Sequence, residues 1–320
     1  MENIIYFVVP CYNESEVLLE TSKQLSLKVK DLIEQGRIAS SSQIVFVDDG
    51  SKDNTWQLIE QLTRQSPLIS GIKLSRNRGH QNALLAGLMS VKDYCDAAIS
   101  LDADLQDDID VIDQFIEKFS YEQCDVVYGV RSKRTTDTLF KRDTAQLFYK
   151  LMNHLGVEMV YNHADYRLMS QRAIESLADF KEVNLFLRGM IPLIGYKSDI
   201  VYYERHERFA GESKYPLGKM ITFALEGITS LSIKPIRMVT MLGILVSLSS
   251  LIPLMYSVLQ WVRGNAVEGW TTIIVSIWVI GGIQILCIGI VGEYIGKIYL
   301  ETKQRPKFII DQFIHNGQSK

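Results

Sequence analysis

The stretch AAISLDADLQDDID (97–110) contains the transition that indicates the fold, an apolar run followed at once by closely spaced aspartates. Ala97 to Leu101 is typical of a buried strand, and Asp102 and Asp104 follow where that strand should end. Carboxylates this close repel one another, and a divalent cation removes the conflict. Mg²⁺ or Mn²⁺ takes one or two protein carboxylates and completes its shell with water and phosphate oxygens. The stretch therefore predicts a strand with a metal and phosphate site at its end.

The residues that follow have two different explanations. Gln106 offers a carbonyl oxygen to the same metal or to a metal-bound water. Asp107, Asp108 and Asp110 open a segment with apolar residues at helical spacing. Acidic residues in the first turn of a helix interact favourably with its dipole, so we expect these three to begin a helix.

Residues 1 to about 130 repeat this alternation of strand and helix patterns. The apolar runs are IIYFVV, QIVFVDD, GIKLS, AAISLD and DVVYGV, with helical patterns near 15–34, 52–65, 79–91 and 109–119. Such alternation predicts an α/β fold with a mostly parallel sheet, which binds ligands beyond the carboxyl ends of its strands. The clusters that follow the runs are PCYNE, DDGSKDNT, SRNRGHQN, DADLQDD and RSKR. They should converge on one edge of the sheet and form a ligand site.

Composition excludes several classes of function. The chain has 320 residues, 47% of them hydrophobic and 22% charged, so it is not a disordered chain. The formal net charge of −3 argues against nucleic-acid binding, which needs a basic face. The cysteines form no CxxC pair, which indicates neither a zinc site nor a disulfide framework.

The C-terminal third contains two long stretches without charge, MVTMLGILVSLSSLIPLMYSVLQWV (238–262) and GWTTIIVSIWVIGGIQILCIGIVG (269–292). Each exceeds the roughly 20 residues that cross a bilayer as a helix. Long helices of soluble proteins carry a polar face, which these stretches lack, so we predict a two-helix transmembrane domain over 236–297. The flanking basic residues are Lys234, Arg237, Lys297, Lys303, Arg305 and Lys307. By the positive-inside rule, both termini and the N-terminal domain should be cytoplasmic.

Two segments border this region. Residues 217–235 combine few charges with apolar residues at helical spacing, which favours an amphipathic juxtamembrane helix; an ordinary core helix is the alternative. Residues 298–320 are predicted to form a loose cytoplasmic tail.

The motifs, taken together, resemble a known family. VVPCYNE, VDDGSKDNT, SRNRGHQNALLAGL and LDADLQDD, in this order, look like a family 2 glycosyltransferase with the GT-A fold. With ADYRLMS, ERFAGESKYPL and the two C-terminal spans, the chain resembles bacterial polyprenyl-phosphate glycosyltransferases of the bactoprenol (undecaprenyl-phosphate) glucosyltransferase type. These are related to dolichyl-phosphate mannose synthases. The resemblance implies a Rossmann-like GT-A domain over 1–216, followed by the interfacial helix and the two transmembrane helices.

The resemblance also implies roles for single residues. The nucleotide pocket would be lined by Pro10, Tyr12, Glu14 and Asp49. The metal and diphosphate site would comprise Asp102, Ala103, Asp104 and Gln106. The basic residues near the donor phosphates would be Arg131, Arg208 and Lys214, and Asp165 would lie near the reacting centre. Alternatives remain for two of them: Arg131 paired with a surface acid, and Asp165 only anchoring Arg167. His80, the one histidine in these motifs, is interpreted as incidental.

The implied reaction is transfer of a single sugar, most simply glucose from UDP-glucose, to polyprenyl phosphate, with Mg²⁺ or Mn²⁺ as cofactor. A lipid phosphate is largely ionised at pH 7, so no strong general base is needed. In-line attack would invert the anomeric centre. The alternatives are a GDP-mannose-dependent mannose synthase and a membrane-anchored scaffold that binds a nucleotide sugar without catalysis.

Partners and location follow from the same resemblance. We expect a multi-pass protein of the bacterial inner membrane that supplies a cell-envelope glycan. The GxxxG spacing of Gly292 and Gly296 favours a homo-oligomer, with a tetramer as one form. A flippase and a downstream glycosyltransferase are expected from the family alone.

Overall fold

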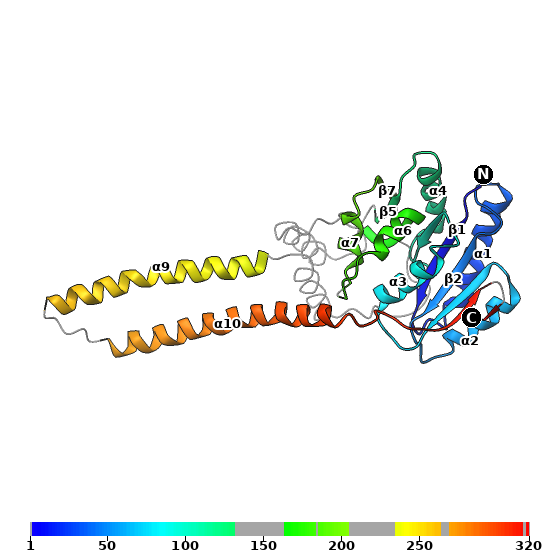
Figure 1. The fold of residues 1–320 in the computed structure, drawn as a ribbon. Helices are drawn as coiled ribbons and strands as arrows, with labels where there is room; N and C mark the ends of the chain where they lie inside the picture. Colours follow the sequence, from blue (N-terminus) through cyan, green and yellow to red (C-terminus); the bar gives the residue numbers. More distant parts are fainter. Residues whose placement is uncertain are drawn as a thin grey trace.

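The computed structural model describes residues 2–131, 163–183, 185–204, 234–263, 269–315 and 318–319. These residues form an α/β domain built on one sheet and a long pair of helices that projects from it (Figure 1). The chain leaves the α/β domain before the first long helix and returns to it after the second.

A nine-stranded sheet forms the centre of the domain, in the order β7-β5-β6-β4-β1-β2-β3-β8-β9. The five apolar runs are all strands, as predicted: β1 (Ile5–Cys11), β2 (Gln43–Asp48), β3 (Ile69–Leu74), β4 (Ala97–Ser100) and β5 (Val126–Arg131). The other strands are β6 (His163–Ser170), β7 (Ser198–Tyr203), β8 (Ile310–His315) and β9 (Gln318–Ser319).

The strand directions correct one prediction and confirm another. The sheet is mixed rather than mostly parallel, because β6 is antiparallel to both β4 and β5, and β8 is antiparallel to β3. Since β6 opposes both of its neighbours, β4 and β5 run the same way, as do β1, β2 and β3. The ends of the five predicted strands therefore meet at one edge, called here the carboxyl edge. The reversed strand β6 brings its first residues to that same edge.

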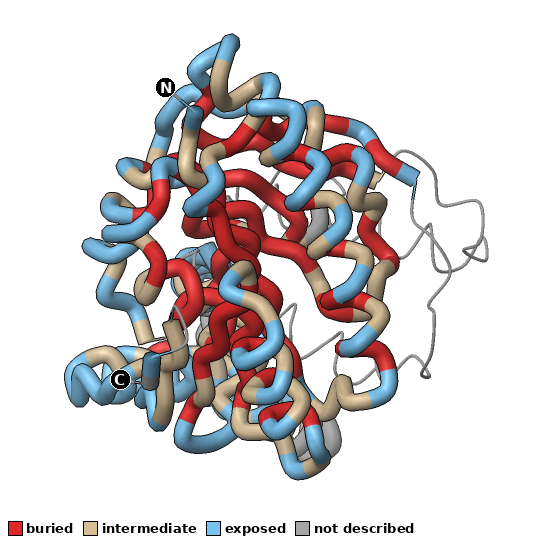
Figure 2. The backbone as a smooth tube through the Cα atoms, turned by 90° about the vertical axis from the view of Figure 1, so that its right-hand side faces the viewer, coloured by how far each residue is buried: buried red, intermediate tan, exposed pale blue. Residues whose placement is uncertain are grey.

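Helices cover both faces of the sheet, and the predicted helical patterns are confirmed. One face carries α1 (Leu18–Glu34), α2 (Thr55–Gln65) and α4 (Ile112–Ser120), which follows the short 3₁₀ helix η1 (Ile109–Val111). The other face carries α3 (His80–Val91), α6 (Gln171–Ala178) and α7 (Leu187–Leu193). Alternate side chains of β1 enter the two cores, Phe7 on one face and Val8 on the other. Figure 2 shows the buried strands running through the centre of the domain.

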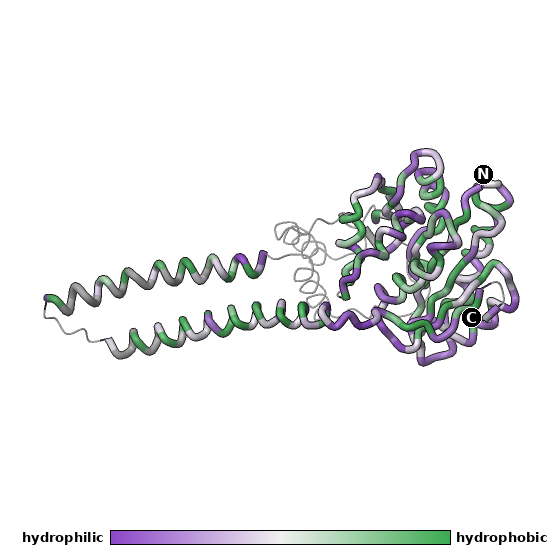
Figure 3. The backbone as a smooth tube through the Cα atoms, viewed as in Figure 1, coloured by the Kyte–Doolittle hydropathy of each residue, from purple (hydrophilic) through white to green (hydrophobic). Residues whose placement is uncertain are grey.

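The projecting pair consists of α9 (Lys234–Val262) and α10 (Trp270–Lys303), so both uncharged stretches are helical. Figure 3 shows apolar residues along both helices, and large side chains such as Ile252 and Ile285 are more than 70% exposed. Among the described residues, one helical segment, Val279–Lys303, is long and apolar enough to cross a membrane. Burial in a protein core does not explain this segment, because almost none of it is buried.

The prediction of a loose tail over 298–320 was wrong. Residues up to Lys303 belong to α10, and β8 then joins the sheet beside β3. Phe313 and Ile314 pack against opposite cores, and Lys73 forms an ion pair with Asp311 at 3.3 Å. The apolar and polar residues of IIDQFIH come in pairs rather than alternating, so the sequence carried no clear strand pattern here.

The juxtamembrane helix predicted over 217–235 lies outside the described residues, except for its last two positions. Arg208 and Lys214 also lie outside the described residues.

Candidate active site

The turns after β1 and β2 are joined by hydrogen bonds to form one wall of the carboxyl edge. The backbone N–H of Asn13 donates to Ser51 Oγ at 2.9 Å, and Lys52 N–H donates to Asn13 Oδ1 at 2.8 Å. Glu14 N–H donates to Thr55 Oγ1 at 2.9 Å, while the Glu14 carbonyl accepts from the first turn of α1. Tyr12 stays 38% exposed beside these bonds, so its ring is available as a face for a base.

Pro10 lies inside β1, one residue before the strand ends. The Val8 carbonyl accepts from Leu101 N–H, so residues 8 and 10 direct their backbone groups towards β4. The ladder with β4 stops at Ser100, opposite Val8, so no carbonyl of β4 pairs at the position of Pro10. A proline without an N–H is tolerated there for this reason.

Asp49 anchors the next turn of the site. Its two carboxylate oxygens accept from the backbone N–H groups of Arg78, at 2.7 Å, and Gly79, at 2.8 Å. Gly50 allows this approach, because it has φ +64° and a Cβ there would lie 2.5 Å from the Arg76 carbonyl carbon. Burial raises the pKa of Asp49, and the two amide hydrogen bonds oppose that rise. The residue predicted to line a nucleotide pocket therefore also fixes the loop that would border it.

The Asp102–Gln106 turn follows β4, as predicted. Ala103 is buried, and its carbonyl accepts from Thr21 Oγ1 at 2.7 Å, which ties the turn to α1. Asp104 Oδ1 accepts from Gln106 N–H at 3.2 Å, and Leu105 between them has φ 55°. Left-handed backbone at a non-glycine residue is strained and is common where a turn positions functional groups.

Asp165, at the start of β6, lies in a cluster of cations. Arg188 from α7 donates to both of its oxygens, at 2.9 and 3.2 Å, and the buried Arg167 also donates to it. Burial opposes ionisation, but Arg188, His80 and Arg167 together hold the pKa of Asp165 well below its usual range. Asp165 does contact Arg167, as the alternative role of anchoring that residue required. This contact is one of several that Asp165 makes with cationic side chains.

The interpretation of His80 as incidental was wrong. Its Nε2 lies 3.5 Å from Asp102 Oδ1 and 3.6 Å from Asp165 Oδ2. Burial of the ring opposes protonation, but the carboxylates of Asp165 and Asp102 outweigh it and raise the pKa of His80 to about 9. His80 is therefore a cation at neutral pH and links the turn after β4 to β6. The sequence carried little sign of this, because β6 follows β4 only after a long gap in the chain.

Asp107 is also more than a helix-starting acid. Its side chain is 3% exposed, lies 3.7 Å from the Arg131 guanidinium and accepts a hydrogen bond from the Tyr203 hydroxyl at the end of β7. Burial, followed by the charge of Asp102, raises the pKa of Asp107 to about 6. Arg131 thus pairs with a buried acid rather than a surface one. Asp108 does begin the helix, because its side chain accepts from Asp110 N–H at 2.9 Å.

Comparison with known proteins fits this geometry. The model of "Glycosyl transferase family 2" matches residues 6–178, and that of "GtrB C-terminal hairpin" matches 234–298. The chain belongs to glycosyl transferase family 2.

The chain also matches curated relatives over nearly their full length. The chain is 53% identical to "Uncharacterized glycosyltransferase YkoT" of Bacillus subtilis (strain 168), covering 98% of this chain and 93% of the relative. It is 42% identical to "Prophage bactoprenol glucosyl transferase homolog" of Escherichia coli (strain K12), over 96% and 98%. It is 41% identical to "Bactoprenol glucosyl transferase" of Shigella phage SfV, over 96% and 97%. Among solved structures, glucosyl-3-phosphoglycerate synthase from Mycobacterium tuberculosis, in complex with Mn²⁺, UDP and phosphoglyceric acid, aligns with a TM-score of 0.45 and 15% identity, over 72% of this chain and 77% of that one.

The residues at the carboxyl edge of this glycosyltransferase suit a divalent cation. Asp102 is 36% exposed at its side chain, which leaves it accessible to a ligand. Asp107 Oδ2 is buried and has no hydrogen-bond partner among the described residues. The carboxylates of Asp102 and Asp104, with the Gln106 amide nearby, match the oxygen donors that Mg²⁺ and Mn²⁺ accept beside a diphosphate.

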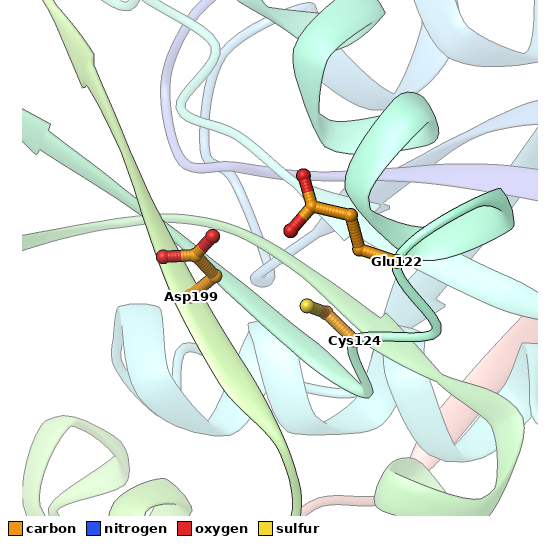
Figure 4. Close-up of side chains that lie close together, drawn as sticks. All are labelled: Glu122, Cys124 and Asp199. Carbon is orange, nitrogen blue, oxygen red and sulfur yellow. The ribbon is translucent and has the colours of Figure 1, made fainter.

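A second group of potential metal ligands lies at the opposite, amino edge of the sheet. Figure 4 shows Glu122, Cys124 and Asp199 pointing towards one another, with their ligand atoms within 4.8 Å. The Lys118 ammonium already pairs with Asp199 and with Glu122, at 3.4 Å from the latter. Burial raises the pKa of the Cys124 thiol, which keeps it protonated. Because Lys118 already pairs with both acids, we interpret this group as an ion-pair cluster.

Proposed function

We propose that this glycosyltransferase transfers a single glucose from UDP-glucose to polyprenyl (undecaprenyl) phosphate at the cytoplasmic face of the membrane, with inversion at the anomeric carbon. The observation that carries the proposal is the gathering of Asp102, Asp104 and Arg131 at the carboxyl edge of a chain with a long apolar helix. The relatives named as bactoprenol glucosyl transferases, about 40% identical over nearly the full chain, support the same substrates.

The donor would bind through the groups of the carboxyl edge. Pro10, Tyr12, Glu14 and Asp49 would border the nucleotide, and Asp102, Ala103, Asp104 and Gln106 would hold Mg²⁺ or Mn²⁺ with the diphosphate. When bound, the metal supplies positive charge that stabilises the leaving diphosphate. Arg131 would add a second positive charge from the end of β5.

Asp165 fits a role other than proton transfer. Its pKa lies well below the usual range, so it remains a carboxylate at neutral pH and is a weak base. A phosphate acceptor is already a nucleophile and requires no base. We infer that Asp165 serves as the counter-charge that holds Arg188 and His80 at the reacting centre.

The membrane arrangement that we propose is supported by how the chain returns to the sheet. Residues before α9 and after α10 both belong to the same α/β domain, since β8 pairs with β3. A chain that leaves and re-enters one domain crosses a membrane an even number of times. We therefore propose two spans over 236–297, with the domain and both termini on one side of the membrane. The flanking basic residues favour the cytoplasmic side, and the sequence pattern favours an interfacial helix over 217–235. The open surroundings of Gly292 and Gly296 leave room for helix packing in a homo-oligomer, such as a tetramer. A flippase and a downstream glycosyltransferase would use the product.

The decisive experiment incubates the purified full-length chain with undecaprenyl phosphate, Mn²⁺ and a panel of UDP- and GDP-sugars, and identifies the lipid product by mass spectrometry. We expect glucosyl phosphoryl undecaprenol from UDP-glucose alone. Product from GDP-mannose would instead support a mannose synthase, and no lipid product from any donor would reject the proposal. We also assign three basic residues, which lie outside the described residues, to the donor diphosphate, the acceptor phosphate or both: Arg205, Arg208 and Lys214. Lys214→Ala should therefore reduce turnover sharply without changing the fold, and wild-type turnover would reject that assignment.

A further inference from the structure

A chain of three side chains connects the buried end of the Asp102–Asp107 segment to Arg131. Arg131 Nε donates to the Tyr203 hydroxyl at 3.2 Å, and that hydroxyl donates to Asp107 Oδ1. The Arg131 guanidinium also lies 3.7 Å from the same carboxylate oxygen. A single hydroxyl therefore accepts from the arginine and donates to the aspartate, which fixes the direction of both bonds.

The position of the Tyr203 ring is set by the two neighbouring strands. Its centroid lies 5.4 Å from that of Tyr166 in an edge-to-face arrangement, and Tyr166 donates to the Asp108 carbonyl at 3.0 Å. Gly129 on β5 leaves space for both rings, because a Cβ there would lie 3.0 Å from Tyr166 and 3.1 Å from Tyr203. The hydroxyl is thus held by packing and has little freedom to follow a moving arginine.

This arrangement is unfavourable for folding alone. The Asp107 side chain is 3% exposed, and its Oδ2 has no hydrogen-bond partner among the described residues. Burying an incompletely satisfied carboxylate costs stability, and apolar side chains of similar size would do better. A buried carboxylate at this position therefore indicates a requirement other than stability.

We propose that Tyr203 and Asp107 are positioning residues that hold the Arg131 guanidinium in place for the donor diphosphate. The inference rests on the proposed function, because it takes the diphosphate as the anion that Arg131 meets. Both residues act through Arg131, so their loss should weaken donor binding and leave acceptor binding unchanged.

The central test removes one hydroxyl group. Tyr203→Phe removes the hydroxyl and keeps the ring. Tyr202→Phe is a matched control, because the Tyr202 side chain is next in the sequence and is 60% exposed. The measurements are the Kd of Mn²⁺–UDP by calorimetry, kcat and KM for UDP-glucose and for undecaprenyl phosphate, and the thermal midpoint. We expect Tyr203→Phe to weaken Mn²⁺–UDP binding and to lower donor kcat/KM about tenfold, with the acceptor KM unchanged. Tyr202→Phe should match the wild type.

Two further variants separate positioning from stability. In an Arg131→Gln background, Tyr203→Phe should have no further effect on the Kd of Mn²⁺–UDP, because the group on which it acts is gone. Asp107→Asn keeps an oxygen for Tyr203 and removes the buried charge, so it should weaken UDP binding while the thermal midpoint stays or rises. A lower midpoint with unchanged UDP affinity in Tyr203→Phe, or an equal effect in both backgrounds, would overturn the inference. UDP binding needs no lipid, so wild-type protein that binds Mn²⁺–UDP but makes no lipid product refutes only the proposed function.

Discussion

The two edges of the central sheet both carry acidic side chains, but these side chains are paired differently at each edge. At the amino edge, Lys118 pairs with Glu122 and Asp199, and Arg172 donates to both oxygens of Asp125. At the carboxyl edge, Asp102 and Asp104 follow one another on a strained turn, and the buried Asp107 keeps an oxygen without a hydrogen-bond partner among the described residues.

This difference separates acids that serve folding from acids that serve a ligand. A folded chain neutralises its buried or crowded carboxylates wherever nothing else requires them. Crowded carboxylates with incomplete pairing are therefore the sign of a binding site. Three potential metal-ligand atoms converge at the amino edge, yet Lys118 already pairs with both acids there. The strained turn and the unsatisfied buried oxygen of Asp107, rather than the proximity of ligand atoms, distinguish the carboxyl edge.

The largest expected effect is that of Asp104→Asn. Loss of this carboxylate should reduce kcat about a thousandfold, roughly 4 kcal/mol of transition-state stabilisation, because the leaving diphosphate loses its metal. Mn²⁺-dependent UDP binding should disappear, as measured by calorimetry, while the thermal midpoint without ligand stays or rises. Asp110→Asn is the matched control, since that side chain is 85% exposed and should behave as wild type. Undiminished metal-dependent UDP binding in Asp104→Asn would place the site elsewhere.

Asp165→Asn should combine a loss of activity with a loss of stability. The substitution leaves Arg167, 1% exposed at its side chain, without its counter-charge, and breaking such a buried pair costs about 3–5 kcal/mol. The pKa of Asp165 is lowered in the folded state, so its stabilisation is complete above the unfolded pKa of about 3.9 and is lost as pH falls below it. The difference in unfolding free energy between wild type and variant should therefore shrink in strong acid. It should also fall as the pH rises from about 6.5 to about 9, because Asp165 raises the pKa of His80 and this second contribution is lost as His80 deprotonates. A difference that instead grows below pH 4 would contradict this assignment.

Asp49→Asn should have an intermediate effect, because it weakens a loop rather than a metal site. An amide offers only one oxygen to the N–H groups of Arg78 and Gly79, so the loop after β3 loses one charge-assisted hydrogen bond, worth about 2 kcal/mol. UDP affinity should fall together with the thermal midpoint. Asp53 supplies a comparison: it accepts from the N–H groups of Ser15 and Thr55, and Asp53→Asn should lower the midpoint with a smaller loss of UDP affinity. Equal losses of UDP affinity in both variants would show that Asp49 has no special place at the site.

The strand-end motifs predicted the carboxyl edge well because they depend on local sequence. Apolar runs followed by polar clusters identified β1 to β5, and the direction of parallel strands brought those clusters together without further information. The same reasoning placed Asp102, Asp104 and Arg131 at one edge. It also identified the helical nature of α9 and α10, whose lack of charge is visible in any window of the sequence.

What the sequence left out depends on contacts between distant segments. Asp165 pairs with Arg188 and His80 only because β6 is inserted in reverse between β4 and β5, and no local pattern predicts strand direction. Tyr203 reaches Asp107 because β7 lies beside β5. The C-terminal strand β8 was missed because six residues after a long apolar helix resemble a tail until β3 supplies a partner.

The smallest effect should come from Lys118→Ala at the amino edge. The side chains of Glu122 and Asp199 are 48% and 38% exposed, and exposed ion pairs contribute less than about 1 kcal/mol each. We therefore expect a slightly lower thermal midpoint, with kcat, KM and Mn²⁺–UDP affinity all unchanged. Water and salt screen the carboxylates of Glu122 and Asp199, which remain exposed in this variant. Asp107 is buried, so its charge is not screened in this way. If Lys118→Ala instead lowered turnover as far as Asp104→Asn does, the amino edge would take part in the reaction, and a strained turn with an unsatisfied buried oxygen would fail as a guide to function.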